Sequence, residues 1–152
     1  TNIGNIGIGH ANGTTNGNTY INFCYNGTQI GTVFQATTSS VTYQTTSDYR
    51  LKENIAPMTG ALAKISALKP VTYTWKVDGS QGQGFIAHEL QAVVPDCVIG
   101  TKDAVDAEGK PIYQGIDTSF LVATLTAAIQ EQQALITTLQ TQVAALQAKV
   151  GA

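Results

Sequence analysis

The stretch SDYRLKENI, residues 47–55, marks the sharpest change in composition along this 152-residue chain. Residues 1–47 contain no Asp, Glu, Lys or Arg, whereas the chain from Asp48 onward carries all 8 basic and all 10 acidic residues. A segment without charged residues therefore meets a segment that contains them at Ser47. The same serine precedes Lys52 by five positions, so the boundary coincides with a candidate pair of nucleophile and base.

The uncharged segment before this boundary is rich in Gly, Asn and Thr. Its β-prone runs at 19–25 and 28–34 flank Asn26-Gly27, the dipeptide that best tolerates the two positive φ values of a type I′ turn, and so predict a hairpin. A third β-prone run follows at 41–46. Because Gly and Asn bury little apolar area while ordering them costs entropy, such a segment gains a core by intertwining with copies of itself. We expect a trimeric β-stalk, with intrinsic disorder as the alternative.

The middle segment has the pattern of a small α+β unit. Apolar residues at helical spacing predict a short helix over 60–68 that ends before Pro70. The other elements expected by period and by turn signals are a strand at 71–77, a loop at 78–84, a buried strand at 85–87, a helix at 88–94 and short strands at 97–99 and 112–113.

The last segment predicts one long helix. It starts at a plausible N-cap, Asp117, and contains neither Gly nor Pro up to Val150. Its apolar residues recur in alternating steps of three and four, which is typical of a coiled-coil seam. The a positions are Ile129, Ile136, Val143 and Val150, and the d positions are Leu125, Gln132, Leu139 and Leu146.

This helix is too long for its own domain to cover. At about 1.5 Å per residue it reaches roughly 50 Å, so it must pack on partner chains. β-Branched residues at a with Leu at d ordinarily favour two strands, so the expected trimer depends on the stalk and not on the seam. The fold class that follows is α+β: an intertwined trimeric β-stalk (1–46), a small α+β core (47–116), and a C-terminal helix in a trimeric coiled coil (117–152).

Charge and cysteine content exclude several classes of function. A net charge of -2 and a pI near 5.5 give no basic footprint for nucleic acid or an anionic membrane. The sequence contains no run of 18 apolar residues, so it predicts no membrane-spanning helix. Cys24 and Cys97 are isolated and lack metal-ligand spacing, so we expect two free thiols, no metal and no cofactor.

Four stretches together carry a family resemblance: SDYRLKENI (47–55), YTWK (73–76), GFIAHELQAVVP (84–95) and LVATLTAAIQ (121–130). They resemble the C-terminal intramolecular chaperone autoprotease of phage endosialidases, a domain type that closes many phage tail spikes, tail fibres and neck appendages. The resemblance covers about residues 41–152. One departure is His88, where the family often has Gln.

The resemblance implies a function. Domains of this family trimerise, template folding of the β-stalk ahead of them and then cut themselves off beside a serine. Carried over, this implies Ser47 as nucleophile and Lys52 as base in a homotrimer whose own stalk is both folding client and cleavage substrate. The expected location is the virion, in a tail fibre or spike assembled in the bacterial cytoplasm, with the chaperone part released after cleavage. The alternative is an uncleaved structural fibre tip or host-binding adhesin.

The proposed chemistry constrains the geometry. A lysine takes a proton only when neutral, and free lysine has a pKa near 10.4, so Lys52 must be desolvated to serve as a base near neutral pH. Five positions apart, Ser47 and Lys52 would lie on opposite faces of a strand, about 16 Å apart, or some 140° apart on a helix. Either the chain turns sharply between Asp48 and Leu51, or Ser47 meets a Lys52 of a neighbouring chain.

The sequence does not decide which peptide bond breaks or which residues support the pair. Attack on the Thr46 carbonyl is an ordinary N-to-O acyl shift and cuts Thr46–Ser47, whereas the resemblance favours Ser47–Asp48. Supporting residues near the pair either orient it or form exposed ion pairs; they are Asp48, Arg50, Glu53 and Asn54. His88 and Glu89, at the start of a predicted helix, are either supporting groups or a packing histidine and a charge favoured by the helix dipole.

Overall fold

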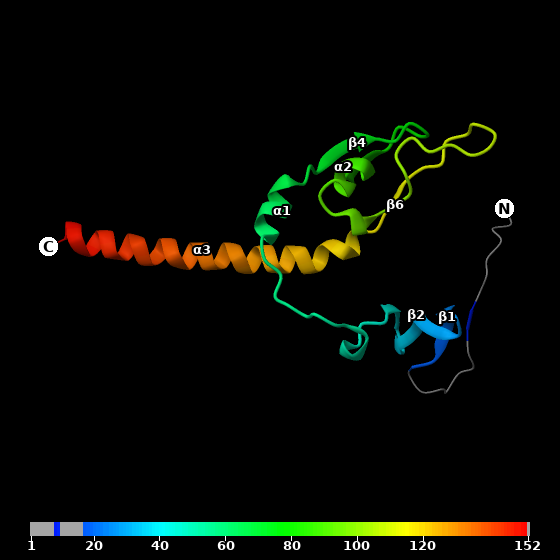
Figure 1. Cartoon of the computed structure of the whole chain (residues 1–152), viewed down its shortest axis with the longest axis horizontal. Helices are drawn as coiled ribbons and strands as arrows, with labels where there is room; N and C mark the ends of the chain where they lie inside the picture. Colours follow the sequence, from blue (N-terminus) through cyan, green and yellow to red (C-terminus); the bar gives the residue numbers. More distant parts are fainter. Residues whose placement is uncertain (1–7, 10–16, 152) are drawn as a thin grey trace. The chain divides into compact units, whose positions relative to one another are not determined.

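The computed structural model describes residues 8–9 and 17–151, and contacts divide the chain into two compact units, Thr1–Ile55 and Ala56–Ala152 (Figure 1). The division follows Ile55, so residues 47–55 group with the uncharged segment. The functional division at residues 46 and 116 stays a prediction. The parts of the expected stalk at 1–7 and 10–16 lie outside the described residues.

The first unit contains an antiparallel sheet in the order β1-β2-β3, with β1 at Thr19–Tyr25, β2 at Thr28–Thr37 and β3 at Ser40–Thr45. Asn26 and Gly27 have φ values of 47° and 78°, as the type I′ turn requires, so the predicted hairpin is confirmed. The predicted third strand is confirmed as well. Many of the sheet's large side chains stay exposed, Tyr25 and Tyr43 among them.

The second unit contains two short antiparallel pairs. β4 (Val71–Thr74) pairs with β5 (Gln81–Gly84), and β6 (Val98–Ile99) pairs with β7 (Gly115–Ile116). The sequence assigned residues 81–84 to a loop, and this was wrong.

The physical reason lies in the pairing of Tyr73 with Gly82. A Cβ at Gly82 would lie 2.6 Å from the Tyr73 ring, so glycine lets that ring cover the neighbouring strand. The expected strand at 85–87 is also absent, because α2 (Ala87–Gln91) begins there. The expected strand at 112–113 occurs three residues later, as β7.

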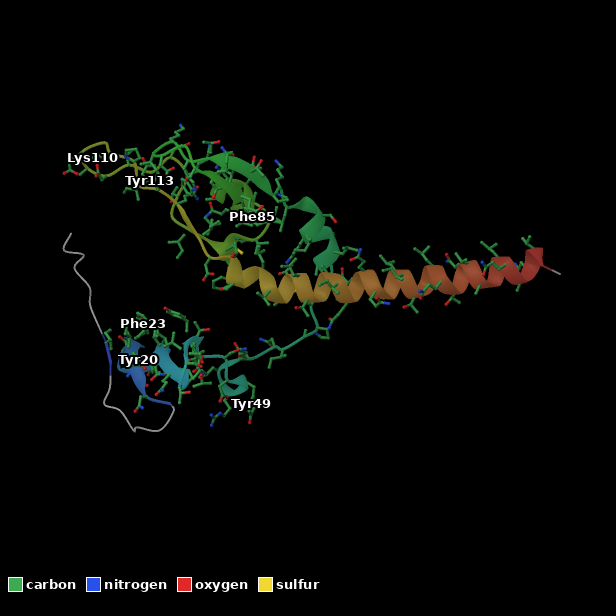
Figure 2. The ribbon with its side chains drawn as sticks, turned by 180° about the vertical axis from the view of Figure 1, so that it is seen from behind. Tyr20, Phe23, Tyr49, Phe85, Lys110 and Tyr113 are labelled. Atoms are coloured by element: carbon green, nitrogen blue, oxygen red, sulfur yellow. The ribbon has the colours of Figure 1, made fainter. Side chains whose placement is uncertain are left out.

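The main apolar cluster lies where α2, β6 and the start of α3 meet. Its buried members are Leu90, Cys97, Val98 and Leu121, and Phe85 packs against them (Figure 2). Burial raises the pKa of the Cys97 thiol, and the charges of Asp117 and Asp96 raise it further. Cys97 is therefore a buried apolar side chain without thiolate reactivity.

The predicted helix at 60–68 is α1 (Ala61–Ala67), and the long C-terminal helix is α3 (Leu121–Val150). A second cluster joins them through Ala61, Ala127 and Ala128. Asp117 caps a 3₁₀ turn, η3 (Thr118–Phe120), that leads into α3. The mixture of antiparallel strands and helices is the predicted α+β class, and the predicted long helix is present (Figure 1).

Candidate active site

A short turn follows the composition boundary. Residues Tyr49–Leu51 form a 3₁₀ turn, η1, that is closed by two backbone hydrogen bonds. The Leu51 N–H donates to the Asp48 carbonyl at 3.1 Å, and the Lys52 N–H donates to the Tyr49 carbonyl at 3.1 Å. The chain therefore turns sharply between Asp48 and Leu51, which is the first of the two geometries expected.

This turn brings the candidate nucleophile and base together within one chain. The Nζ of Lys52 donates a hydrogen bond to the Oγ of Ser47 at 2.6 Å. That distance is within the reach that proton transfer requires. A charged ammonium can only donate in this contact, whereas a neutral amine can accept the serine's proton.

The pair is open to solvent, and several large apolar residues lie near it in the sequence. Ser47 and Lys52 are both exposed in the single chain. Tyr49, Leu51 and Ile55, each within three sequence positions of Ser47 or Lys52, are 74%, 72% and 72% exposed, and we call these three side chains the apolar rim. Figure 2 labels Tyr49 on the turn. Large apolar side chains that are this exposed are typical of a surface that another molecule covers.

Asp48 and Arg50 form a bidentate ion pair across the turn. Arg50 donates from Nε to Oδ1 of Asp48 at 2.9 Å and from Nη2 to Oδ2 at 2.7 Å. The backbone N–H of Arg50 also donates to Oδ1 at 2.9 Å. The guanidinium first, and then this backbone N–H, hold the pKa of the Asp48 carboxyl below its usual range. The same bond raises the pKa of Arg50.

The other predicted supporting residues lie on both units. Glu53 is exposed, and Asn54 has a positive φ of 53°, a conformation that Asn tolerates better than most residues. On α2, His88 is exposed and Glu89 forms an ion pair with Lys69 at 3.7 Å. The interpretation of Glu89 as a charge favoured by the helix dipole stays a prediction.

Sequence reasoning missed one carboxylate with a structural role, that of Glu131. Its Oε1 accepts the Ala61 N–H at 3.0 Å and its Oε2 accepts the Leu62 N–H at 2.8 Å, so α3 caps the start of α1. These N–H groups, Leu62's first, lower the pKa of the Glu131 carboxyl. The only signal in the sequence is that Glu131 is the one charged residue between Asp117 and Lys149.

No group of three or more His, Cys, Asp or Glu residues lies close enough to hold a metal ion among residues 8–9 and 17–151. No helix in that same part is long and apolar enough to cross a membrane.

The comparisons with known proteins bear on the segment that contains the pair. Residues 47–99 match the family described as the chaperone of endosialidase. This match confirms the resemblance drawn from the sequence. We call residues 47–99 the endosialidase-chaperone segment. The segment begins at Ser47 and includes η1, α1, β4, β5 and α2. The family is named as one of peptidases and described as a chaperone of the endosialidase type. No curated protein matches the chain.

Proposed function

We propose that this chain is an intramolecular chaperone that trimerises, templates folding of a β-stalk in a phage tail spike or fibre, and then cuts itself beside Ser47. One observation carries the proposal: the 2.6 Å hydrogen bond between Lys52 Nζ and Ser47 Oγ, inside the endosialidase-chaperone segment. A serine and a lysine at this distance are the two groups that an activated hydroxyl nucleophile needs.

The steps of the cut follow from these two groups. The neutral amine of Lys52 removes the Oγ proton of Ser47, and the oxygen attacks a peptide carbonyl carbon. A C–O bond forms and the C–N bond breaks, while the ammonium returns its proton to the leaving amine. Water then hydrolyses the ester. With the Thr46 carbonyl as target this is an N-to-O acyl shift. A cut at Ser47–Asp48 needs a neighbouring chain or an activated water.

Association of copies of the chain is supported by the two faces of α3, whereas the number of three rests on the expected stalk. Buried or half-buried residues on one face, including Thr124, Ala128 and Glu131, pack against the rest of the unit. The seam positions of the same stretch are on a different face, and Leu125 and Ile129 are 42% and 64% exposed. The contact with α1 therefore leaves the seam free along the whole helix for partner chains.

Assembly also supplies the change of environment that the base needs. Lys52 and the apolar rim are exposed in the single chain. Cover by partner chains would remove water from the rim and from the amine together, which disfavours the charged form of a lysine. Cleavage then reports that folding and assembly have finished, which is what a removable template requires.

The test is self-cleavage of the purified chain. We expect wild type to run on denaturing gels as a small N-terminal and a larger C-terminal fragment, while Ser47→Ala and Lys52→Ala stay whole at 16.0 kDa. Lys64→Ala, which removes an exposed lysine from α1, is the matched control and should cut like wild type. Intact-mass measurement of both fragments decides between Thr46–Ser47 and Ser47–Asp48.

An uncut wild-type trimer would reject the peptidase and favour the alternative, a structural fibre tip or host-binding adhesin. Cleavage that persists in Ser47→Ala would also reject the proposal, because it would assign the cut to another protease. The localisation in a virion tail fibre or spike follows only if self-cleavage is found in the parent particle.

A further inference from the structure

The geometry of the Ser47–Lys52 pair depends on a turn that has no core. None of the residues of η1 is buried, so apolar packing cannot hold the turn in place. A 3₁₀ turn of three residues also has poorer hydrogen-bond geometry than an α-helix and does not persist alone. Something other than burial must keep the two ends of this turn together.

One carboxylate supplies that constraint. The two oxygens of Asp48 accept three hydrogen bonds from Arg50, at 2.7, 2.9 and 2.9 Å, one from its backbone and two from its side chain. The backbone bond makes Asp48 the N-cap of the turn. The guanidinium bonds form a planar, two-pronged contact that fixes the orientation of the carboxylate. Ser47 precedes this cap and Lys52 follows the turn, so the cap sets the distance between them.

We propose that Asp48 is a positioning residue for self-cleavage: its carboxylate forms the turn that places Lys52 Nζ on Ser47 Oγ, and Arg50 braces that carboxylate. This inference rests on the proposed self-cleavage and deepens it. It also assigns Arg50 a role as a brace, in place of a donor to the oxyanion. The guanidinium atoms Nε and Nη2 of Arg50 both donate hydrogen bonds to the Asp48 carboxylate.

The chain offers a matched control in Asp117. That residue also precedes a three-residue 3₁₀ turn, and it accepts the N–H of the residue two positions on, Ser119, at 2.9 Å. Unlike η1, the turn after Asp117 continues directly into α3, so a long helix supports it. Removing each cap separates loss of a cap in general from loss of the cap beside the pair.

The experiment measures the rate of self-cleavage in assembled trimers of each variant, with the oligomeric state checked by light scattering. Asp48→Ala should cut on the order of 100-fold more slowly than wild type, because misplacement of reacting groups by about 1 Å costs that much. Asp48→Asn keeps the cap oxygen and Arg50→Ala keeps the whole carboxylate. Both should cut within about fivefold of wild type, since an exposed ion pair contributes little. Asp117→Ala should cut at the wild-type rate.

Rescue by Asn is the readout that a general loss of stability would not give. Slowing of Asp48→Asn to the level of Asp48→Ala would overturn the inference, because Asn retains the acceptor that forms the turn. So would an Asp48→Ala trimer that cuts within a few-fold of wild type. In either case Ser47→Ala and Lys52→Ala would still be uncut, and the proposed function would stand.

A second measurement does not depend on cleavage. In the uncut Ser47→Ala chain, amide hydrogen exchange at Arg50, Leu51 and Lys52 reports the turn directly. Adding Asp48→Ala should remove the protection of these amides. Unchanged protection would overturn the role of the carboxylate in the turn. If Asp48→Ala removes the protection but the wild-type chain never cuts itself, the proposed self-cleavage is rejected. The positioning role is then rejected with it.

Discussion

The two stretches of α3 differ in whether their own unit buries them. From Leu121 to Glu131 the helix packs within its own unit through a buried face, and Glu131 caps α1. From residue 132 to 150 every residue is exposed, including Ile136, Leu139 and Val143. Figure 1 shows the second stretch extending beyond α1 with no element of its unit beside it.

This difference shows which part of the apolar surface of α3 a single chain can bury by folding. In the first stretch the inward residues are mostly small, and this lets a short helix approach closely. In the second stretch the apolar residues are large and keep the seven-residue period of the seam. A helix face of this kind gains little in water unless other helices bury it. The first stretch is thus buried by folding, and we propose that the second is buried by assembly.

The largest expected effect comes from breaking the second stretch. The double change Ile136→Asn and Leu139→Asn places polar side chains at one a and one d position. Burial of each such residue contributes about 1.5–3 kcal/mol, and three chains lose both, so the dissociation constant should rise by several orders of magnitude. We expect monomers at micromolar concentration, measured by analytical ultracentrifugation, and no self-cleavage, because the pair then stays hydrated.

The control places the same residue off the seam. Thr138→Asn and Gln140→Asn change exposed positions on either side of Leu139 and should leave the trimer and its cleavage intact. A seam variant that remains trimeric would contradict the assignment of the interface. Monomers that still cut themselves would instead contradict the proposal that assembly desolvates Lys52 and favours its neutral form.

A smaller effect is expected from the first stretch. Glu131→Ala removes both acceptors from the start of α1, and leaves the N–H groups of Ala61 and Leu62 without their partner. We expect the melting temperature to fall by a few degrees with the trimer unchanged, measured by calorimetry. The adjacent Gln130→Ala, at an exposed position, should leave the melting temperature near the wild-type value. Equal stability of Glu131→Ala and wild type would show that the alanine contacts alone hold α1.

The same contrast explains which features the sequence revealed. The hairpin, α1 and α3 were predictable because their signals are local: a turn dipeptide, or a regular apolar period. β5 was missed because Gln81–Gly84 has no β-forming side chain, and its pairing depends on Tyr73 covering Gly82.

The candidate site was predictable in its residues but not in its geometry. The family motif indicated Ser47 and Lys52, whereas the choice between a sharp turn and a neighbouring chain needed the cap that Asp48 forms with Arg50. Glu131 acts 69 and 70 positions from its partners, and no pattern in one sequence encodes such a contact.

The smallest expected effect is the pH dependence of the Glu131 contact. Backbone N–H groups at the start of α1, that of Leu62 first, lower the pKa of this carboxyl below its ordinary value of 4.5 in the folded state. A lowered pKa stabilises the fold fully above 4.5, and the contribution is lost as the pH falls through the folded value. Glu131→Gln resembles the protonated acid and keeps one acceptor oxygen. The melting temperature of wild type should therefore exceed that of Glu131→Gln at neutral pH, and the two should converge in acid.

Asp48, Asp78 and Asp117, whose pKa values are also lowered, are common to both proteins, so their acid sensitivity cancels in the difference. A gap that stays constant down to strongly acidic pH would mean that the charge of Glu131 does not contribute, and that the contact acts only through the shape of the side chain.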